Sequence, residues 1–328
     1  MISEQTAPDS NELWMPMDDG TQLFVRQWKT PGRPKAVLHI VHGMTEHCRR
    51  YTRLAQRLVE EGIETWAADQ RGHGETSINR LNDPGKGGLF GHCADDDGFS
   101  RVTSDIHILN KAIQKKYPGV PLFLLGHSWG SFIAQNYIEN FEGKEKDSVT
   151  LAGCILSGTR GPDGIKIAMG VPLMSFLTFM IGQRNGSLIA KAAADGPYNK
   201  AFRPNRTDFD LLSRDEKEVD LYAADPFCGK LCSVGFYRDI SRALKRIHLP
   251  VEMGKIRKEL PIYIFSGSAD PVGNMGESPA ALVVAYRHLG ITDLETVLYP
   301  DARHETLNET NRDEVQESLI SWLIRHCS

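Results

Sequence analysis

The sequence predicts an α/β protein in which a mostly parallel sheet is covered by helices on both faces. Short apolar runs alternate along the chain with segments whose apolar residues recur at helical spacing, a rhythm typical of parallel sheets. The runs 36–41 and 151–156 are almost continuously apolar, as expected of strands buried on both faces. Over 158–258 the rhythm breaks, glycine and proline become frequent, and no clear strand is found. We therefore expect a core formed by 1–157 and 259–328, with a helical cap inserted between the two parts.

The composition is that of an ordinary globular protein whose partners are small molecules. The chain of 328 residues is 41% hydrophobic and 24% charged, which allows one large α/β domain with an insertion. Its formal net charge of −4 provides no basic field, so no nucleic-acid partner is expected. The expected partners are uncharged or amphiphilic small molecules, and the sequence indicates no particular oligomeric state.

A hairpin is expected to open the fold. Asp18-Asp19-Gly20 is a turn signal between two short runs of strand-forming residues. Further along, Pro118 and Pro121 end a helix and precede the apolar run 122–125, which predicts a buried strand. The expected strands are 13–17, 22–28, 36–41, 64–68, 122–125, 151–156, 262–265 and 294–298.

Two of the expected helices have recognisable beginnings. Asp95-Asp96-Asp97 places negative charge at the start of a helix whose apolar face covers 99–113, where the helix dipole favours it. Asn311 and Glu314 stand in capping-box positions at the start of the last helix. Another helix is expected near 277–289.

The most informative stretch is Gly126-His127-Ser128-Trp129-Gly130, which follows the expected strand 122–125 and precedes a helix. G-x-S-x-G in this context is typical of a nucleophile elbow, a sharp turn that exposes the serine hydroxyl above the sheet. Glycines on either side leave room for the turn. The pentapeptide alone is also compatible with an ordinary glycine-rich turn, so the rest of the chain has to supply the other catalytic groups.

Acyl transfer by a serine needs a base, and an acid that orients the base. In folds with this elbow the acid and the base follow the serine in that order, each just beyond the end of a strand. Asp270 follows one expected strand and His304 follows the next. Because the carboxyl ends of parallel strands meet at one edge of the sheet, we expect Ser128, Asp270 and His304 to lie together.

Other acidic and imidazole groups are expected to be structural. Asp69 also ends a strand, but it precedes the serine, and its neighbours Arg71 and His73 indicate a structural loop network. His39 lies within a buried strand and His107 lies on a helix face.

The oxyanion hole is expected from main-chain N–H groups. One is that of Trp129, the residue after the nucleophile, and the other is that of Met44, in the loop after an early strand. His42 and His47 flank that loop and are expected to shape the pocket.

No metal or cofactor is expected. Only Cys228 and Cys232 of the six cysteines lie close together, and they lack a second ligand pair with zinc-like spacing. The segment 1–11 is polar, with no apolar signal core, and the scattered cysteines suit reduced thiols. The sequence therefore favours a cytoplasmic protein, with peripheral membrane contact left open.

The apolar run 165–181 lies within the expected cap and is rich in methionine and phenylalanine. A membrane-spanning helix is not expected, because Pro172 interrupts the run, Lys166 lies inside it, and it is shorter than about 20 residues. Two interpretations stay open: a buried packing helix, or a lid that lines an acyl-chain channel or touches a lipid surface.

At these residues the chain resembles the serine α/β-hydrolases of the lysophospholipase and monoacylglycerol lipase family. The resemblance spans about 36–325 and weakens in the insertion. The matching stretches are His42-Gly43-Met44-Thr45-Glu46-His47, Asp69-Gln70-Arg71-Gly72-His73-Gly74, the elbow at 126–130, Ser266-Gly267-Ser268-Ala269-Asp270-Pro271 and Arg303-His304-Glu305. The chain departs from the family at Met44 and Thr45, where small residues are common, and at Trp129, where many lipases carry methionine.

The resemblance implies an α/β-hydrolase fold with an eight-stranded, mostly parallel sheet and a helical lid. It also implies that Glu46 and Arg50 help to form the polar end of the pocket, and we place His127 with them as a substrate-binding residue. The hypothesis is a serine carboxylic-ester hydrolase that cleaves a monoacylglycerol or a lysophospholipid through an acyl-enzyme on Ser128. One alternative is a proline-iminopeptidase-like aminopeptidase, in which Glu46 or the acidic cluster 208–220 would bind a substrate amino group. Another is a ligand-binding protein that has kept the fold without catalysis.

Overall fold

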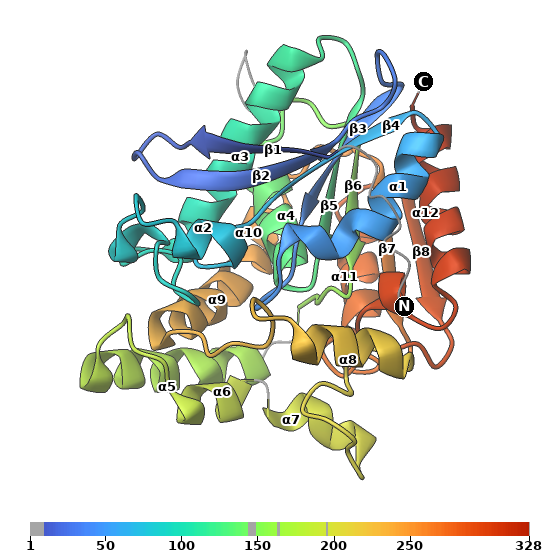
Figure 1. The fold of residues 1–328 in the computed structure, drawn as a ribbon. Coiled ribbons are helices and arrows are strands. Elements are labelled where there is room, and N and C mark those ends of the chain that lie inside the picture. Colours follow the sequence, from blue (N-terminus) through green and yellow to red (C-terminus); the bar gives the residue numbers. More distant parts are fainter. Residues whose placement is uncertain (1–9, 144–148, 163–164, 195, 328) are drawn as a thin grey trace, which may run out of the picture.

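The structure, a computed structural model, describes residues 10–143, 149–162, 165–194 and 196–327 (Figure 1). Within this part the strands form one eight-stranded sheet in the order β1-β2-β4-β3-β5-β6-β7-β8. The hairpin strands β1 and β2 are antiparallel to their neighbours, and the remaining pairs are parallel. The predicted fold class is therefore confirmed.

The strands lie close to the predicted ranges. They are β1 (Ser10–Pro16), β2 (Gln22–Trp28), β3 (Ala36–Val41), β4 (Ile63–Ala68), β5 (Leu122–His127), β6 (Gly153–Ser157), β7 (Ile262–Gly267) and β8 (Leu294–Tyr299). The α-helices are α1 (Thr52–Glu60), α2 (Gly74–Ile78), α3 (Gly98–Lys116), α4 (Trp129–Asn140), α5 (Ile165–Ile181), α6 (Leu188–Ala194), α7 (Gly196–Asn199), α8 (Glu216–Ala224), α9 (Val234–Ile247), α10 (Pro250–Met253), α11 (Glu277–His288) and α12 (Arg312–Arg325).

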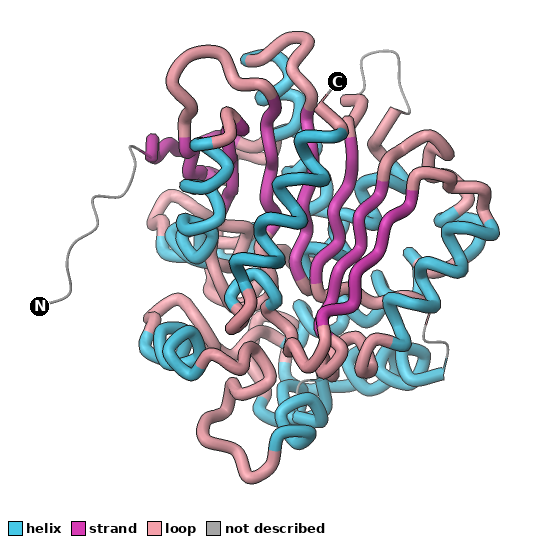
Figure 2. Tube along the Cα trace, turned by 90° about the vertical axis from the view of Figure 1, so that its right-hand side faces the viewer, coloured by secondary structure: helices cyan, strands magenta, loops and turns pink. Residues whose placement is uncertain are grey.

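The central strands are buried on both faces because alternate side chains enter two separate hydrophobic clusters. In β3, Val37 and Val41 pack into the cluster shared with α3, α4 and α11, whereas Leu38 and Ile40 pack into the cluster shared with α1 and α12. Figure 2 shows the resulting layers, with helices on either side of the sheet. This explains why these strands are continuously apolar in sequence.

The insertion enters between two strands that are neighbours in the sheet, since β6 and β7 pair in parallel. Its described residues contribute α5 to α10 and no strand of the sheet. In Figure 1, α5 to α8 lie beyond the carboxyl ends of the parallel strands. We call residues 158–258 the cap segment. Helix α9 belongs to it in sequence, yet Phe236 and Tyr237 of α9 pack into the core cluster of α3 and α4.

Helix α5 is partly a buried packing helix and partly an exposed apolar surface, the two interpretations that its sequence left open. Met174 is buried and Leu177 packs against the core cluster, while Phe176, Phe179 and Met180 are exposed. The side chains of 165–170, which include Lys166 and Met169, lie outside the described residues, as does the segment 1–9. Among the described residues no helix is long and apolar enough to span a membrane.

The two predicted helix starts have different outcomes. Asp97 caps α3, because its carboxylate accepts from the backbone N–H of Ser100 at 3.1 Å. The capping box at α12 is wrong. Asn311 is the N-cap residue, but its side-chain oxygen Oδ1 accepts from Arg214 at 3.1 Å and its side-chain amide donates to Glu314 at 2.9 Å. Neither side chain therefore caps the helix backbone.

Candidate active site

Ser128 lies at the turn between β5 and α4 in a backbone conformation that few side chains adopt, with φ +53° and ψ −121°. The flanking glycines are required by close approach. A Cβ at Gly126 would lie 2.3 Å from the carbonyl oxygen of Gly130, and one at Gly130 would lie 2.1 Å from that of Val41. The turn therefore has the geometry expected of a nucleophile elbow.

The structure brings Ser128, His304 and Asp270 into one hydrogen-bonded chain. His304 Nε2 lies 2.8 Å from Ser128 Oγ, and His304 Nδ1 lies 2.9 Å from Asp270 Oδ2. Asp270 is fully buried, and its other oxygen accepts from the N–H of Val272 at 2.9 Å. The carboxylate is thus held on both sides, as an acid that orients an imidazole must be.

The environment of His304 favours its protonated form. Burial lowers its pKa, but the charge of Asp270 and the hydrogen bond to it have the larger combined effect, so the pKa is raised above its ordinary value. A base with a raised pKa takes the proton of a serine hydroxyl more readily.

The loop after β3 lies against the nucleophile, since a Cβ at Gly43 would lie 3.3 Å from Ser128 Cβ. Its peptide groups are held from two sides. His42 Nδ1 lies 2.7 Å from the carbonyl oxygen of Gly43, and the N–H of Gly43 donates to Glu46 at 2.5 Å. Because the N–H of a peptide points opposite to its carbonyl, fixing the Gly43 carbonyl also fixes the direction of the Met44 N–H.

The tautomer of His42 follows from its partners. Its Nε2 accepts from the backbone N–H of Gln70 at 2.9 Å, so Nδ1 carries the proton and donates to Gly43. Burial lowers the pKa of His42, which keeps the ring neutral in this role. The sequence analysis expected His42 to shape the pocket, and in the structure its ring joins the Gly43 carbonyl to the backbone N–H of Gln70.

Glu46 and Arg50 form a buried ion pair directly beneath this loop. Arg50 donates to Glu46 at 2.8 Å and to both carboxylate oxygens of Glu305 at 2.5 and 2.7 Å. Glu46 also accepts from Tyr51 Oη at 2.9 Å. Burial raises the pKa of Glu46, but the charge of Arg50, the neighbouring histidines and the hydrogen bond from Gly43 together have the larger effect, so the pKa is lowered. These charged groups support the loop, and their contact with a substrate remains a prediction.

The cap segment reaches the same loop at Thr45, a residue with a left-handed φ of +54°. The Thr45 carbonyl accepts from Tyr222 Oη of α8 at 2.9 Å and from the N–H of Gly229 at 3.0 Å. Thr45 Oγ1 and Tyr222 Oη are 2.9 Å apart. Two groups of the cap segment therefore hold the residue next to Met44, a contact that sequence reasoning missed.

Replacing Tyr222 by phenylalanine is expected to lower kcat about fivefold to tenfold with little change in KM. The substitution keeps the ring but removes the hydroxyl that holds Thr45, and such a hydrogen bond contributes about 1 to 1.5 kcal/mol. Steady-state kinetics on a short-chain ester would measure it. Tyr286→Phe, at a buried tyrosine of α11, is the matched control, and equal kcat values for the two variants would contradict the expectation.

His127 lies beside His304, with 4.9 Å between the centroids of the two rings. Its Nδ1 is 3.3 Å from Ser157 Oγ. Burial, aided by the charge of His304, lowers the pKa of His127 to about 4, so this ring is neutral at pH 7. The predicted substrate-binding residue is thus an uncharged neighbour of the base.

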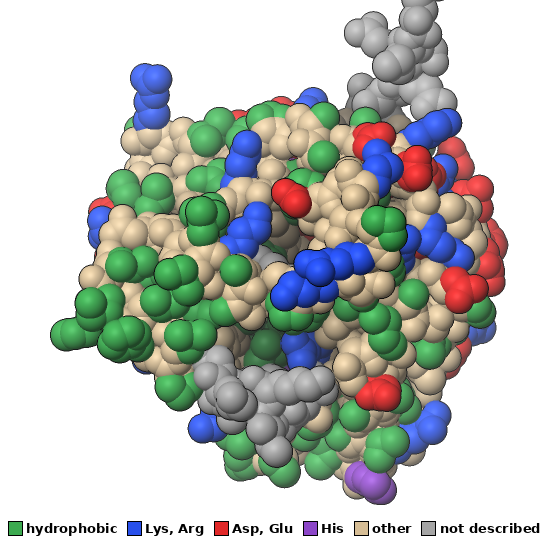
Figure 3. Space-filling model, turned by 90° about the horizontal axis from the view of Figure 1, so that it is seen from below, with side chains coloured by type: hydrophobic (Ala, Val, Ile, Leu, Met, Phe, Trp, Pro, Cys, Tyr) green, Lys and Arg blue, Asp and Glu red, His purple; other side chains and the backbone are tan. Residues whose placement is uncertain are grey.

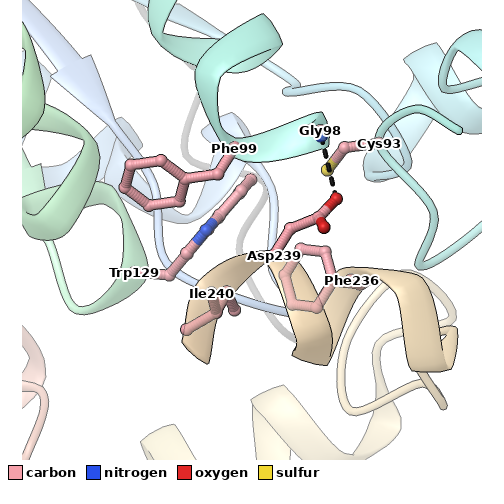
Figure 4. Close-up of a pocket in the computed structure, with 7 residues that line it drawn as sticks. All are labelled: Cys93, Gly98, Phe99, Trp129, Phe236, Asp239 and Ile240. Carbon is pink, nitrogen blue, oxygen red and sulfur yellow. Dashed lines mark hydrogen bonds between the residues drawn. The ribbon is translucent and has the colours of Figure 1, made fainter. Parts of the chain in front are cut away.

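The Trp129 side chain is buried in the hydrophobic cluster that it shares with Phe99 and Phe236. Figure 4 shows the indole near Phe99 and Phe236, with Asp239 bonded to the N–H of Gly98 at the start of α3. The indole also stacks on His73, with centroids 5.0 Å apart. The oxyanion-hole prediction concerns the main-chain N–H of Trp129 at the start of α4. It therefore does not depend on where the indole side chain packs.

The competing acid has a structural position, as expected. Asp69 accepts from the N–H groups of Cys48 and Glu75, both at 2.8 Å. Arg71 is fully buried and pairs with Asp19 and Asp105.

Comparison with known proteins relates this chain to serine hydrolases. Residues 32–311 match the family described as serine aminopeptidase, S33. The chain is 31% identical to the monoglyceride lipase of Rattus norvegicus over 77% of its own length and 71% of that protein. It is 26% identical to the monoacylglycerol lipase of Mycolicibacterium smegmatis over 94% of both chains. A thermostable carboxyl esterase from Bacillus coagulans, solved in complex with glycerol, superposes with a TM-score of 0.87 at 28% identity, covering 97% of this chain and 99% of that chain.

Proposed function

The chain belongs to the serine aminopeptidase S33 family, and from this premise we propose that it is a serine ester hydrolase that cleaves monoacylglycerols. The observation that carries the proposal is the chain of hydrogen bonds from Asp270 through His304 to Ser128, at 2.9 and 2.8 Å. Relatives named monoglyceride or monoacylglycerol lipase, aligned over most of the chain, support the choice of substrate.

The reaction proceeds through an acyl-enzyme on Ser128. His304 takes the proton of Ser128 Oγ as this oxygen attacks the ester carbonyl carbon, and Asp270 stabilises the imidazolium. The main-chain N–H groups of Met44 and Trp129 bind the oxyanion. His304 then protonates the departing glycerol oxygen. It next takes a proton from water, whose oxygen attacks the acyl carbon. As the bond from the acyl carbon to Ser128 Oγ breaks and the fatty acid leaves, His304 returns the proton to Ser128 Oγ.

The exposed apolar side chains of the cap segment favour contact with a lipid surface. They gather on α5 and α6, with Phe179 85% exposed, and Figure 3 shows apolar side chains spread over this face. The exposed set consists of Leu173, Phe176, Phe179, Met180, Ile181, Leu188 and Ile189. A patch of this kind suits transient docking on a membrane or micelle that holds the substrate.

Six free thiols also suit a cytoplasmic location.

Replacing Phe176 and Phe179 together by serine is expected to lower kcat/KM on vesicle-borne monoacylglycerol about tenfold. Two exposed phenyl rings contribute a large share of the apolar area that can enter the lipid interface. Activity on a short-chain ester dispersed as monomers should be unchanged. Val251→Ser with Val284→Ser, at exposed valines of α10 and α11, provides the control. An equal loss on both substrates would argue against interfacial docking.

The aminopeptidase alternative has less support, because its candidate acidic subsites already have partners. Glu46 is bonded to Arg50, to Tyr51 and to the loop backbone. In the cluster 208–220, most carboxylates are paired within the chain: Asp210 with backbone N–H groups, Asp215 with Arg312, Glu218 with Arg53 and Asp220 with Arg206.

A substrate panel tests the proposal. The values of kcat/KM for a monoacylglycerol, a lysophospholipid and an aminoacyl-naphthylamide should fall in that order, with Ser128→Ala as the blank. A preference for the lysophospholipid would support the ester-hydrolase mechanism but assign a different head group to the substrate. Hydrolysis of the naphthylamide alone would overturn the esterase assignment, and failure of a fluorophosphonate probe to label Ser128 would favour a non-catalytic binding protein.

A further inference from the structure

A second cluster of chemically active side chains lies where the cap segment meets the core. It consists of His47, Asp225 and Cys228, whose potential ligand atoms all lie within 4.8 Å of one another. His47 follows the loop that carries Met44, whereas Asp225 and Cys228 follow α8 in the cap segment. The triad uses none of the three. Their arrangement therefore needs its own explanation.

Asp225 and Cys228 are presented together by one tight turn. The N–H of Cys228 donates to the Asp225 carbonyl at 3.1 Å, and Pro226 occupies the second position of this turn, where its fixed φ is favoured. Asp225 Oδ1 accepts from the N–H of Phe227 at 2.8 Å. The bond orients the carboxylate and leaves Oδ2 directed at His47. The spacing of two residues between the two side chains is the one that zinc sites use to present a pair of ligands from a turn.

The separations suit a small ion bound by nitrogen, oxygen and sulfur. Bond lengths of about 2.0 to 2.3 Å in a tetrahedral zinc site imply separations of about 3.3 to 3.6 Å between ligand atoms. His47 Nε2 lies 3.0 Å from Asp225 Oδ2, within a few tenths of an ångström of this value. The Cys228 sulfur lies within 4.8 Å of the ligand atoms of His47 and Asp225.

The surrounding charge also favours a cation. The charged groups that act most strongly on Cys228 are the guanidinium of Arg50 and the carboxylates of Asp225, Glu46 and Glu305. Three carboxylates against one guanidinium leave an excess of negative charge around the cluster. A divalent ion compensates this charge, and the partly exposed Asp225 leaves a path from solvent.

We propose that His47, Asp225 and Cys228 form a binding site for a zinc-class divalent cation, with a fourth position open to water. Imidazole, carboxylate and thiolate are the ligands that zinc prefers. The ion ties the turn at 225–228 to the loop at 45–47. It therefore joins cap and core beside the contact between Thr45 and Gly229.

Cobalt(II) titration of the metal-free protein, with a non-thiol reductant present, tests the site. Thiolate-to-cobalt charge-transfer absorption should rise to one equivalent in the wild type, and zinc should displace the cobalt. In Cys228→Ala the band should vanish, and zinc affinity measured against a chromogenic chelator should fall at least about 100-fold, since even partners outside the coordination shell contribute tenfold to 100-fold. Zinc should also raise the Tm of the wild type but not of this variant.

Cys232→Ala is the matched control, because Cys232 is a buried cysteine four residues away that lies in a different hydrophobic cluster. This variant should bind cobalt and zinc as the wild type does. If Cys228→Ala fails to fold, Asp225→Asn keeps an acceptor for the Phe227 N–H while removing the charged ligand, and it should bind zinc more weakly. Absence of the charge-transfer band in the wild type, or unchanged zinc affinity in the ligand variants, would overturn the proposal.

Discussion

Replacing Ser128 by alanine is expected to lower kcat about 10⁴-fold to 10⁶-fold on any ester that the wild type hydrolyses. The substitution removes the attacking oxygen, so what remains is the contribution of the oxyanion hole and of substrate binding. The fold should persist, because alanine meets the same restriction as serine at φ +53° and the main-chain bonds of the elbow are kept.

Burst-phase and steady-state kinetics measure the loss, and thermal unfolding checks the fold. Ser104→Ala, in the middle of α3, controls for the loss of a serine hydroxyl and should retain full activity. Retention of even one hundredth of the wild-type rate by Ser128→Ala would place the nucleophile elsewhere.

Replacing Asp270 by asparagine is expected to lower kcat by about three to four orders of magnitude. An amide keeps the size of the side chain but cannot stabilise an imidazolium, and it favours the wrong tautomer of the base. Asp69→Asn is the informative comparison, because Asp69 bonds to backbone N–H groups away from His304. Asp69→Asn should lower the melting temperature while kcat changes little. A loss of kcat larger than that of Asp270→Asn would instead assign the acid that orients His304 to Asp69.

The same substitution should move the pH profile of kcat/KM. His304 acts as a base only when neutral, so wild-type activity should rise with pH through an apparent pKa above the ordinary imidazole value of 6.5. In Asp270→Asn the raising charge is gone and burial remains, so the acid limb should shift to lower pH. The residual activity of this variant, measured from pH 4 to 9, reports the shift. An acid limb at unchanged pH would show that another group sets it.

The clustering of the three proposed catalytic residues could be predicted from sequence because each of them follows a strongly patterned strand. An apolar run predicts the strand, and a parallel sheet brings the carboxyl ends of its strands to one edge. Ser128, Asp270 and His304 are 34 to 176 residues apart, yet this rule places them together. The two glycines of the elbow are a further local signal, because the backbone packs so closely there that a Cβ at either position would clash.

The contacts that support the loop carrying Met44 could not be predicted in the same way. Arg50 meets Glu305 across 255 residues, and Tyr222 meets Thr45 across 177. Neither pair follows a periodicity, and Tyr222 comes from the irregular insertion. The capping box predicted at Asn311 was wrong for a related reason, since Arg214 of the cap segment donates to the side-chain oxygen Oδ1 of Asn311. Local sequence patterns predict helices and strands. The partners of these side chains depend instead on how the insertion packs against the core, which no local pattern indicates.

The contact between Tyr222 and Thr45 has a consequence for recombining relatives of this protein. The insertion is joined to adjacent strands β6 and β7, so its exchange for another insertion leaves the sheet order intact. Yet exchanging the insertion would replace Tyr222 and Gly229, the two described groups that donate hydrogen bonds to the Thr45 carbonyl. A chimera of this kind inherits part of its catalytic scaffold from the donor of the insertion. Its turnover number and its substrate selectivity would therefore change together.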